Sequence, residues 1–96
     1  MTRVRWTSQE IEDIQSIRDF ISRDSQKYAA LVVEKLIAAV DLLEEFPLAG
    51  RVVPELSRED VRELVRPPYR IVYRVLKDGV DVATVFRSSR VIPGLP

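Results

Sequence analysis

The 96-residue sequence predicts a single two-layer α+β domain, 1–96, with the element order β-α-α-β-β-β. In the first half of the chain, apolar residues recur at helical spacing, whereas residues 61–86 follow the period of two that is typical of strands. The gap between the two predicted helices is short, which indicates an antiparallel helical hairpin. We therefore expect this hairpin to pack on one face of a small, mainly antiparallel sheet.

The first predicted strand, Arg3–Trp6, leads into an amphipathic helix that begins after Thr7. Thr7 and Glu10 stand three positions apart, as in a capping box, immediately before the apolar pattern. That pattern consists of Ile11, Ile14, Ile17 and Ile21. We expect the helix to end near Arg23–Asp24.

The second predicted helix runs from Gln26 to Glu45, with Ser25 as its N-cap and Pro47 as its stop signal. The apolar residues of this helix extend beyond a single face. The residues that widen the apolar stripe are Leu31, Ile37 and Leu42, so we expect more than one side of this helix to be covered. The following loop contains Gly50, which we expect to adopt a left-handed backbone conformation.

Three strands are predicted after this loop, at residues 61–66, 69–76 and 80–86, with Pro67-Pro68 as a break. Asp78-Gly79 is a strong signal for a two-residue hairpin loop. This loop would pair Val75 with Val82, Tyr73 with Thr84 and Ile71 with Phe86 on the helix-facing side. On the opposite side, Arg74 would face Ala83, Val72 would face Val85, and Arg70 would face Arg87.

Like charges directly opposite each other destabilise a strand pair, so the predicted pairing of Arg70 with Arg87 needs compensation. One interpretation is structural: Glu63, on the neighbouring strand, would sit between Arg70 and Arg74. The other is functional: the arginines would await an external anion, and Arg90 would extend the site. Both interpretations stay open on the sequence alone.

Composition excludes several classes of function. The chain has no cysteine and no histidine, which removes disulfides, thiolate nucleophiles, histidine catalysis and the usual zinc sites. We expect no metal and no cofactor, since no phosphate-binding glycine loop or metal-ligand cluster is present. No apolar run is long enough to span a membrane, and the first six residues do not resemble a signal peptide.

Other polar residues have simple structural interpretations. Tyr69 and Tyr73 fall on the predicted helix-facing side, where core positions are more natural than catalytic ones. Glu55 follows Pro54 in a loop, and a solvated or capping carboxylate is its simplest interpretation, with a general base as the alternative.

Four segments occur in the order Pro47-x-x-Gly50-Arg51-x-Val53-Pro54-Glu55-Leu56, Arg62-Glu63-Leu64, Pro68-Tyr69-Arg70-Ile71-Val72-Tyr73-Arg74-Val75 and Val85-x-x-x-x-Arg90. Together they resemble the RelE/ParE toxin superfamily, and the resemblance covers nearly the whole chain. Such proteins are the toxins of bacterial type II toxin–antitoxin pairs. The resemblance implies a cytoplasmic protein in a hetero-oligomer with a cognate antitoxin, which would supply any contacts to DNA.

The resemblance implies two possible activities. RelE-like members enter the ribosome and cleave mRNA. In such a nuclease, Arg70 and Arg90 would match arginines that bind phosphate. Glu55 falls near a loop glutamate that acts as a base. ParE-like members bind DNA gyrase without catalysis. Nucleases of the RelE type carry lysines where this chain has Val61 and Glu63. The net charge of this chain is zero, which is unusual for a protein that binds ribosomal RNA. Both features favour the ParE-like branch.

We therefore expect a ParE-like, gyrase-binding toxin with no catalytic residue. Its predicted target-binding residues are Arg70, Arg74, Arg87 and Arg90, supported by Glu63. The alternative is a ribosome-dependent endoribonuclease that uses Arg70, Arg90 and Glu55. Arg87 stands where the ParE-like branch often has histidine, so an inactive remnant that would not arrest growth is a third possibility.

Overall fold

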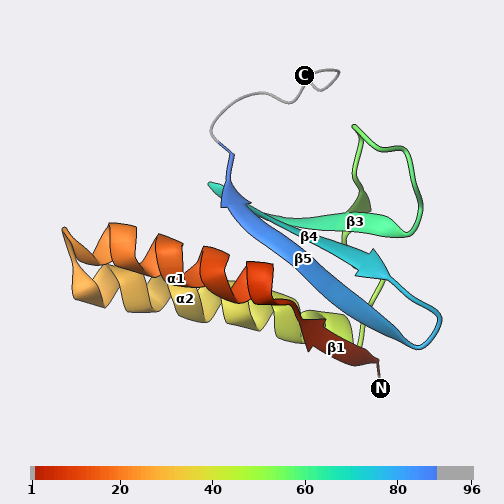
Figure 1. Cartoon of the computed structure of the whole chain (residues 1–96), viewed down its shortest axis with the longest axis horizontal. Helices are drawn as coiled ribbons and strands as arrows, with labels where there is room; N and C mark the ends of the chain where they lie inside the picture. Colours follow the sequence, from red (N-terminus) through yellow and green to blue (C-terminus); the bar gives the residue numbers. More distant parts are fainter. Residues whose placement is uncertain (1, 89–96) are drawn as a thin grey trace.

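Two helices pack on one side of a five-stranded sheet, which confirms the predicted α+β class (Figure 1). The computed structural model describes residues 2–88, and the elements follow the predicted order with one additional short strand. They are β1 (Arg3–Trp6), α1 (Ser8–Ser22), α2 (Gln26–Asp41), η1 (Leu42–Glu44), β2 (Arg51–Val52), β3 (Val61–Arg66), β4 (Tyr69–Val75) and β5 (Gly79–Arg87).

The strand order in space is β1-β5-β4-β3-β2. β1 runs parallel to β5, and every other neighbouring pair is antiparallel. The two-residue strand β2 lies within the segment that the sequence predicts to be a loop, and it pairs Arg51 with Glu63. In Figure 1 the α1–α2 turn projects well beyond the strands, so part of the helical hairpin extends past the sheet.

The Thr7 and Ser25 side chains both cap their helices as predicted, but the second half of the predicted capping box is absent, because the Glu10 carboxyl oxygens have no hydrogen-bond partner among the described residues. The Thr7 side chain accepts a hydrogen bond from the backbone N–H of Glu10, and the Ser25 side chain accepts one from Tyr28. α1 ends at Ser22, close to the predicted position. α2 changes to a single 3-10 turn at Leu42, so the regular helix is one turn shorter than predicted.

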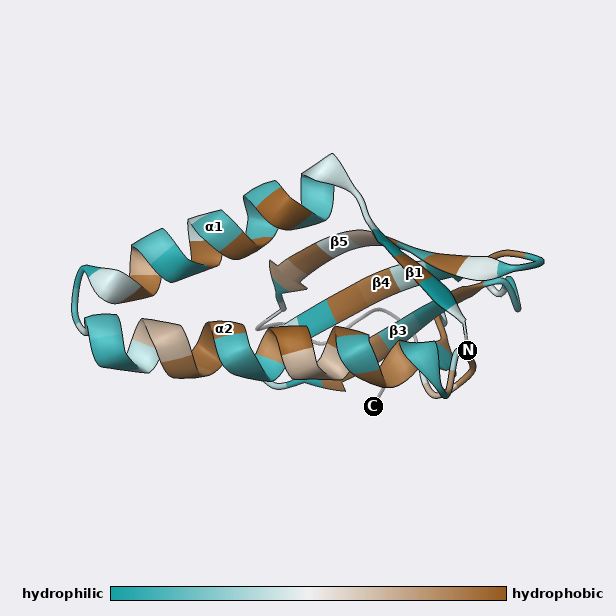
Figure 2. Ribbon diagram, turned by 90° about the horizontal axis from the view of Figure 1, so that it is seen from below, coloured by the Kyte–Doolittle hydropathy of each residue, from teal (hydrophilic) through white to brown (hydrophobic). Residues whose placement is uncertain are grey.

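The core lies between the helices and the sheet. Figure 2 shows polar and apolar residues alternating around α1, as expected for a helix with one buried face. The largest apolar side chains with almost no exposed surface are Leu36, Leu43, Ile71 and Tyr73. Tyr69 and Tyr73 are both buried here, which confirms the side of the sheet that the sequence predicts for them.

Gly50 is required by close packing. A Cβ atom at Gly50 would stand 2.6 Å from the Glu63 carbonyl oxygen and from the Tyr73 hydroxyl. The Gly50 N–H donates to that hydroxyl at 2.8 Å. Gly50 does not adopt the left-handed conformation that we expected. Among the described residues other than glycine, Ser57 has a positive φ, of 51°.

The predicted register of the β4–β5 hairpin was wrong. Leu76 N–H donates to the Gly79 carbonyl at 2.8 Å, so the two loop residues are Lys77 and Asp78, one position earlier than predicted, and Val75 pairs with Val80. A register shift between Val72 and Tyr73 then leaves Ala83 without a partner. Beyond this bulge, Ile71 pairs with Val85, Arg70 with Phe86, and Tyr69 with Arg87.

A contact from α1 explains the bulge. The Asp13 carboxylate accepts hydrogen bonds from the Thr84 hydroxyl at 2.5 Å and the Val85 N–H at 3.0 Å. Because the extra residue shifts the alternation along β5, Val85 faces the helices and Phe86 lies on the opposite side. Phe86 is therefore 38% exposed instead of part of the core.

Candidate functional site: the arginine face of the sheet

The side of the sheet away from the helices carries most of the residues that the sequence singles out. We call this side the arginine face. Its strand residues are Arg51, Glu63, Arg70, Arg74 and Phe86, and the loop between β2 and β3 adds Glu55 and Asp60.

Glu63 is the centre of this cluster. Its side chain has no exposed surface, and it accepts hydrogen bonds from Arg70 Nε at 2.8 Å and from Arg51 Nε at 2.7 Å. It also accepts a hydrogen bond from Arg70 Nη2. The predicted pairing of Glu63 with Arg70 is confirmed, whereas its second partner is Arg51 and not Arg74. Sequence reasoning missed Arg51 because β2 was not predicted.

Arg70 is almost completely enclosed. Its side chain is 7% exposed, and its guanidinium lies 5.5 Å from the centre of the Phe86 ring, in cation–π geometry. Burial by itself lowers the pKa of Arg70, but hydrogen bonds and charge interactions with Glu63 and Glu55 outweigh it and raise the pKa. The side chain is therefore a fixed cation.

Glu55 contacts Arg70 from the loop side. Its Oε2 lies 3.4 Å from Arg70 Nη1, its Oε1 lies 3.5 Å from Arg70 Nη2, and its side chain is 37% exposed. A hydrogen bond from its own backbone N–H, together with Arg70 and Arg51, lowers the pKa of Glu55. Glu55 is therefore ionised at neutral pH.

Arg74 lies further along the same face and is the more accessible cation, with 58% of its side chain exposed. Its Nε stands 3.4 Å from Asp60, which also binds Arg58 at 2.7 Å. The hydrogen bond from Arg58, and the positive charges of Arg58 and Arg74, lower the pKa of Asp60.

The structure separates Arg87 from this cluster, which corrects the expected juxtaposition of Arg70 and Arg87. Arg87 pairs with Tyr69, a residue of the helix-facing side, because the β5 bulge shifts the alternation by one position. Arg90 lies outside the described residues. Of the four arginines predicted to bind the target, Arg70 and Arg74 therefore share a face.

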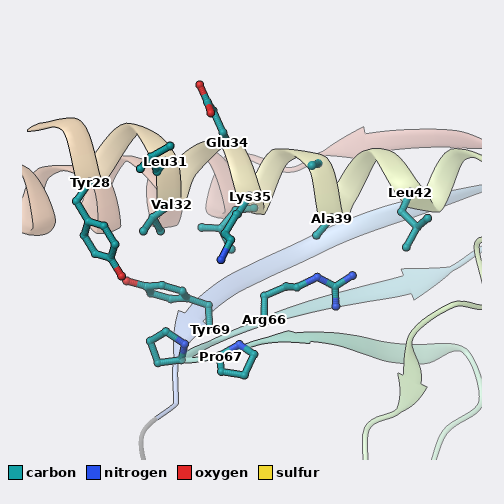
Figure 3. Close-up of a pocket in the computed structure, with 13 residues that line it drawn as sticks. Tyr28, Leu31, Val32, Glu34, Lys35, Ala39, Leu42, Arg66, Pro67 and Tyr69 are labelled. Atoms are coloured by element: carbon teal, nitrogen blue, oxygen red, sulfur yellow. The ribbon is translucent and has the colours of Figure 1, made fainter.

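A second surface lies on the other side of the sheet, where α2 meets the turn between β3 and β4 (Figure 3). A groove of about 770 Å³ runs between them. Tyr28 and Leu31 of α2 line it and are more than half exposed. Lys35 and Arg66 add positive charge from its two walls. One sequence feature points to this groove: Leu31 and Leu42, which widen the apolar stripe of the second helix, both line it.

Two negative findings concern the described part of the chain. No helix within residues 2–88 is long and apolar enough to cross a membrane. In the same range, no group of three or more His, Cys, Asp or Glu side chains could hold a metal ion.

The fold is shared with chains of two solved toxin–antitoxin systems. One is a chain of the chromosomal ParDE toxin–antitoxin system from P. aeruginosa, with a TM-score of 0.75 and 22% identity over 93% of this chain and 98% of that one. Another is a chain of the toxin–antitoxin complex RelBE2 from Mycobacterium tuberculosis, with a TM-score of 0.62 and 23% identity over 93% of each chain. This chain therefore shares the fold of these two chains.

Sequence comparison identifies the family. The family described as "ParE toxin of type II toxin-antitoxin system, parDE" matches residues 4–92. The protein Y4kP of Sinorhizobium fredii is 37% identical over 93 residues, which are 95% of this chain and 93% of that protein. Toxin RelE2 of Caulobacter vibrioides is 34% identical over 90 residues, 94% of this chain and 99% of that protein. The chain belongs to the ParE toxin family of type II toxin–antitoxin systems.

Proposed function

We propose that this toxin arrests growth by binding DNA gyrase, and that it acts through protein contacts instead of catalysis. The observation that carries the proposal is the state of Arg70. A nuclease site needs cations whose charge is free to hold a phosphate, but the charge of Arg70 is already balanced by the buried carboxylate of Glu63. Because gyrase is the proposed target, the site of action is the bacterial cytoplasm.

The ribosome-dependent endoribonuclease is the second candidate, and one observation favours it. Glu55 and Arg70, the base and the phosphate ligand of that hypothesis, lie in contact. However, a general base works best when its pKa is close to the working pH, and the pKa of Glu55 is lowered. The buried negative charge of Glu63 beside Arg70 would also repel a phosphate. We therefore favour gyrase binding.

We further propose that a cognate antitoxin neutralises the toxin by binding the groove between α2 and the β3–β4 turn. The exposed apolar side chains of Tyr28 and Leu31 suit an amphipathic segment, and Lys35 and Arg66 suit acidic residues on it. The toxin and antitoxin would form a hetero-oligomer. Any contact with DNA would belong to the antitoxin.

A supercoiling assay tests the target. Purified toxin is added to gyrase and relaxed plasmid, and trapped cleavage complexes are scored with and without the antitoxin. We expect inhibition that the antitoxin relieves. The parallel experiment is an mRNA cleavage assay on translating ribosomes. Cleavage there, with gyrase unaffected, would replace the gyrase proposal with the nuclease, and no effect in either assay or on growth would indicate an inactive remnant.

A further inference from the structure

We propose that Arg70 is a binding site for an acidic side chain of the toxin's protein target, and that Glu55 occupies this site until the target displaces it. The inference deepens the proposed function, because it takes the target to be a protein, and it adds how the site is regulated. Glu55 would be an internal substitute for the partner's carboxylate.

The two carboxylates that contact Arg70 differ in how firmly they hold it. Glu63 belongs to a central strand, has no exposed side-chain surface and lies 2.8 Å from Arg70 Nε. Glu55 belongs to a loop, is 37% exposed and lies 3.4–3.5 Å from the two terminal nitrogens of Arg70. Strong charged hydrogen bonds are about 2.7–2.9 Å long. Glu63 is therefore a permanent partner, whereas Glu55 makes a long contact that can be exchanged.

Displacement of Glu55 does not require the loop to unfold. The backbone around it is held by a turn in which the N–H groups of Leu56 and Ser57 both donate to the Val53 carbonyl at 3.1 Å. The Glu55 carboxylate is separated from this turn by three side-chain bonds, and rotation about them moves it into solvent. The terminal nitrogens of Arg70 would then be open on the side that Glu55 now covers.

The charges favour a carboxylate as the replacement. Arg51, Arg70, Glu55 and Glu63 together carry no net charge, so withdrawal of Glu55 leaves a surplus of one positive charge. The position already accepts two carboxylate oxygens opposite two guanidinium nitrogens, which is the fork geometry that arginine forms with carboxylates. A phosphate would bring more negative charge close to the buried Glu63. The site therefore fits an aspartate or glutamate side chain better than a nucleic acid.

The surroundings provide a place for such a contact. Phe86, which packs over the Arg70 guanidinium, is 38% exposed, and Leu56, which follows Glu55, is 52% exposed. Apolar residues beside an ion pair exclude water once a partner covers them, and this strengthens the pair. Arg74, on the same face, supplies a second and accessible cation.

NMR of the arginine guanidinium groups tests the inference without any assumption about gyrase. Wild-type toxin, Glu55→Gln and the matched control Glu59→Gln are titrated with acetate and, separately, with inorganic phosphate. Glu59 is an exposed residue of the same loop and has no contact with Arg70 in the structure. In Glu55→Gln we expect acetate to shift the Arg70 resonances with a half-saturation concentration about fivefold lower than in wild type. Glu59→Gln should behave as wild type, and Arg74 should respond alike in all three proteins.

Three results would overturn the inference. Equal responses of Arg70 in wild type and Glu55→Gln would mean that Glu55 does not block it, and no response in Glu55→Gln would mean that Arg70 is not a site. A stronger response to phosphate than to acetate would assign the site to a nucleic acid. If Arg70 responds as expected but the toxin does not inhibit gyrase, the site stands and the proposed target fails.

Discussion

Glu10 has an ionisable carboxyl group in a buried position, where its charged form is disfavoured. Its side chain is fully buried, and within residues 2–88 neither of its carboxyl oxygens has a hydrogen-bond partner. Burial, and then the nearby negative charge of Asp13, raise the pKa of Glu10 from 4.5 to about 8. The side chain is therefore largely protonated at neutral pH.

This pKa makes stability depend on pH. Below about pH 4.5 the carboxyl is protonated in the folded and the unfolded chain, and its full contribution to stability is present. Between about 4.5 and 8 the folded state keeps a proton that the unfolded state loses, so the free energy of unfolding falls as the pH rises. Glu10→Gln, which cannot ionise, should remove this dependence and be more stable than wild type by about 4 kcal/mol at pH 8, because each unit of the raised pKa is worth about 1.4 kcal/mol.

Urea unfolding at a series of pH values measures this effect. Glu12→Gln is the matched control, because Glu12 lies on the same helix and is exposed. It should keep the pH dependence of the wild type. Parallel curves for wild type and Glu10→Gln across this range would show that Glu10 does not titrate as expected.

Glu63 should be the least replaceable charge in the protein. Removal of one partner from a buried ion pair leaves the other charge uncompensated, at a cost of about 3–5 kcal/mol. We expect Glu63→Gln to lower the free energy of unfolding by that amount, because Arg70 and Arg51 both lose their closest carboxylate. Asp81→Asn, which breaks the more exposed pair with Arg5, should cost at most about 1 kcal/mol. Similar losses in urea unfolding for the two variants would contradict the central role of Glu63.

At the level of the elements, contacts from Thr7 and α1 determine where the register of β5 shifts. The Thr7 hydroxyl donates to the Val82 carbonyl at 2.6 Å, and Asp13 binds Thr84 and Val85 on the other side of the bulge. These contacts explain why β5 changes register where it does. They also determine that Phe86 packs over Arg70, because the shift places Phe86 on the arginine face.

Asp13→Ala should therefore loosen the bulge. The variant loses the two hydrogen bonds from β5 and an exposed one from the Gln9 side chain, and it leaves the Val85 N–H without its partner, so we expect a loss of about 2–3 kcal/mol. Amide hydrogen exchange should accelerate most at Val85. Asp19→Ala, at an exposed position of the same helix, should change stability by less than about 0.5 kcal/mol. Unchanged exchange at Val85 would show that Asp13 does not hold the bulge.

At the level of the whole molecule, we propose that the two sides of the sheet bind different partners. The arginine face is a compact set of charges that would contact the target, and the groove between α2 and the β3–β4 turn would contact the antitoxin. Because the two surfaces lie on opposite sides of the sheet, substitutions that weaken one should leave the other intact.

Leu31→Ser tests the groove. Leu31 lines it and is 51% exposed, so its loss should weaken antitoxin binding about tenfold or more with little effect on folding. Ile37→Ser is the matched control, because Ile37 is 39% exposed on the same helix but does not line the groove. Calorimetric titration of each variant with the antitoxin measures the difference. Equal affinities would mean that the antitoxin binds elsewhere. Inhibition of gyrase by free Leu31→Ser should match that of the wild type.

Much of the fold can be predicted from the sequence because it depends on local chemistry. Helix periodicity, the caps at Thr7 and Ser25 and the break at Pro67-Pro68 act within a few residues of the chain, so the order of elements follows from reading them. The buried side of Tyr69 and Tyr73 follows from strand alternation for the same reason. The partnership of Glu63 with Arg70 could be inferred because neighbouring strands place them on one face.

Tertiary structure decided the features that depend on contacts between distant segments. The bulge in β5 follows from Asp13, some 70 positions earlier in the chain, and it separates Arg87 from Arg70. The pairing of Arg51 with Glu63 depends on a two-residue strand that is too short for any periodicity to reveal. The need for glycine at position 50 comes from the approach of Tyr73. In each case the sequence supplied the residues, but their partners were set by packing of the helices and the loop against the sheet, which no local pattern encodes.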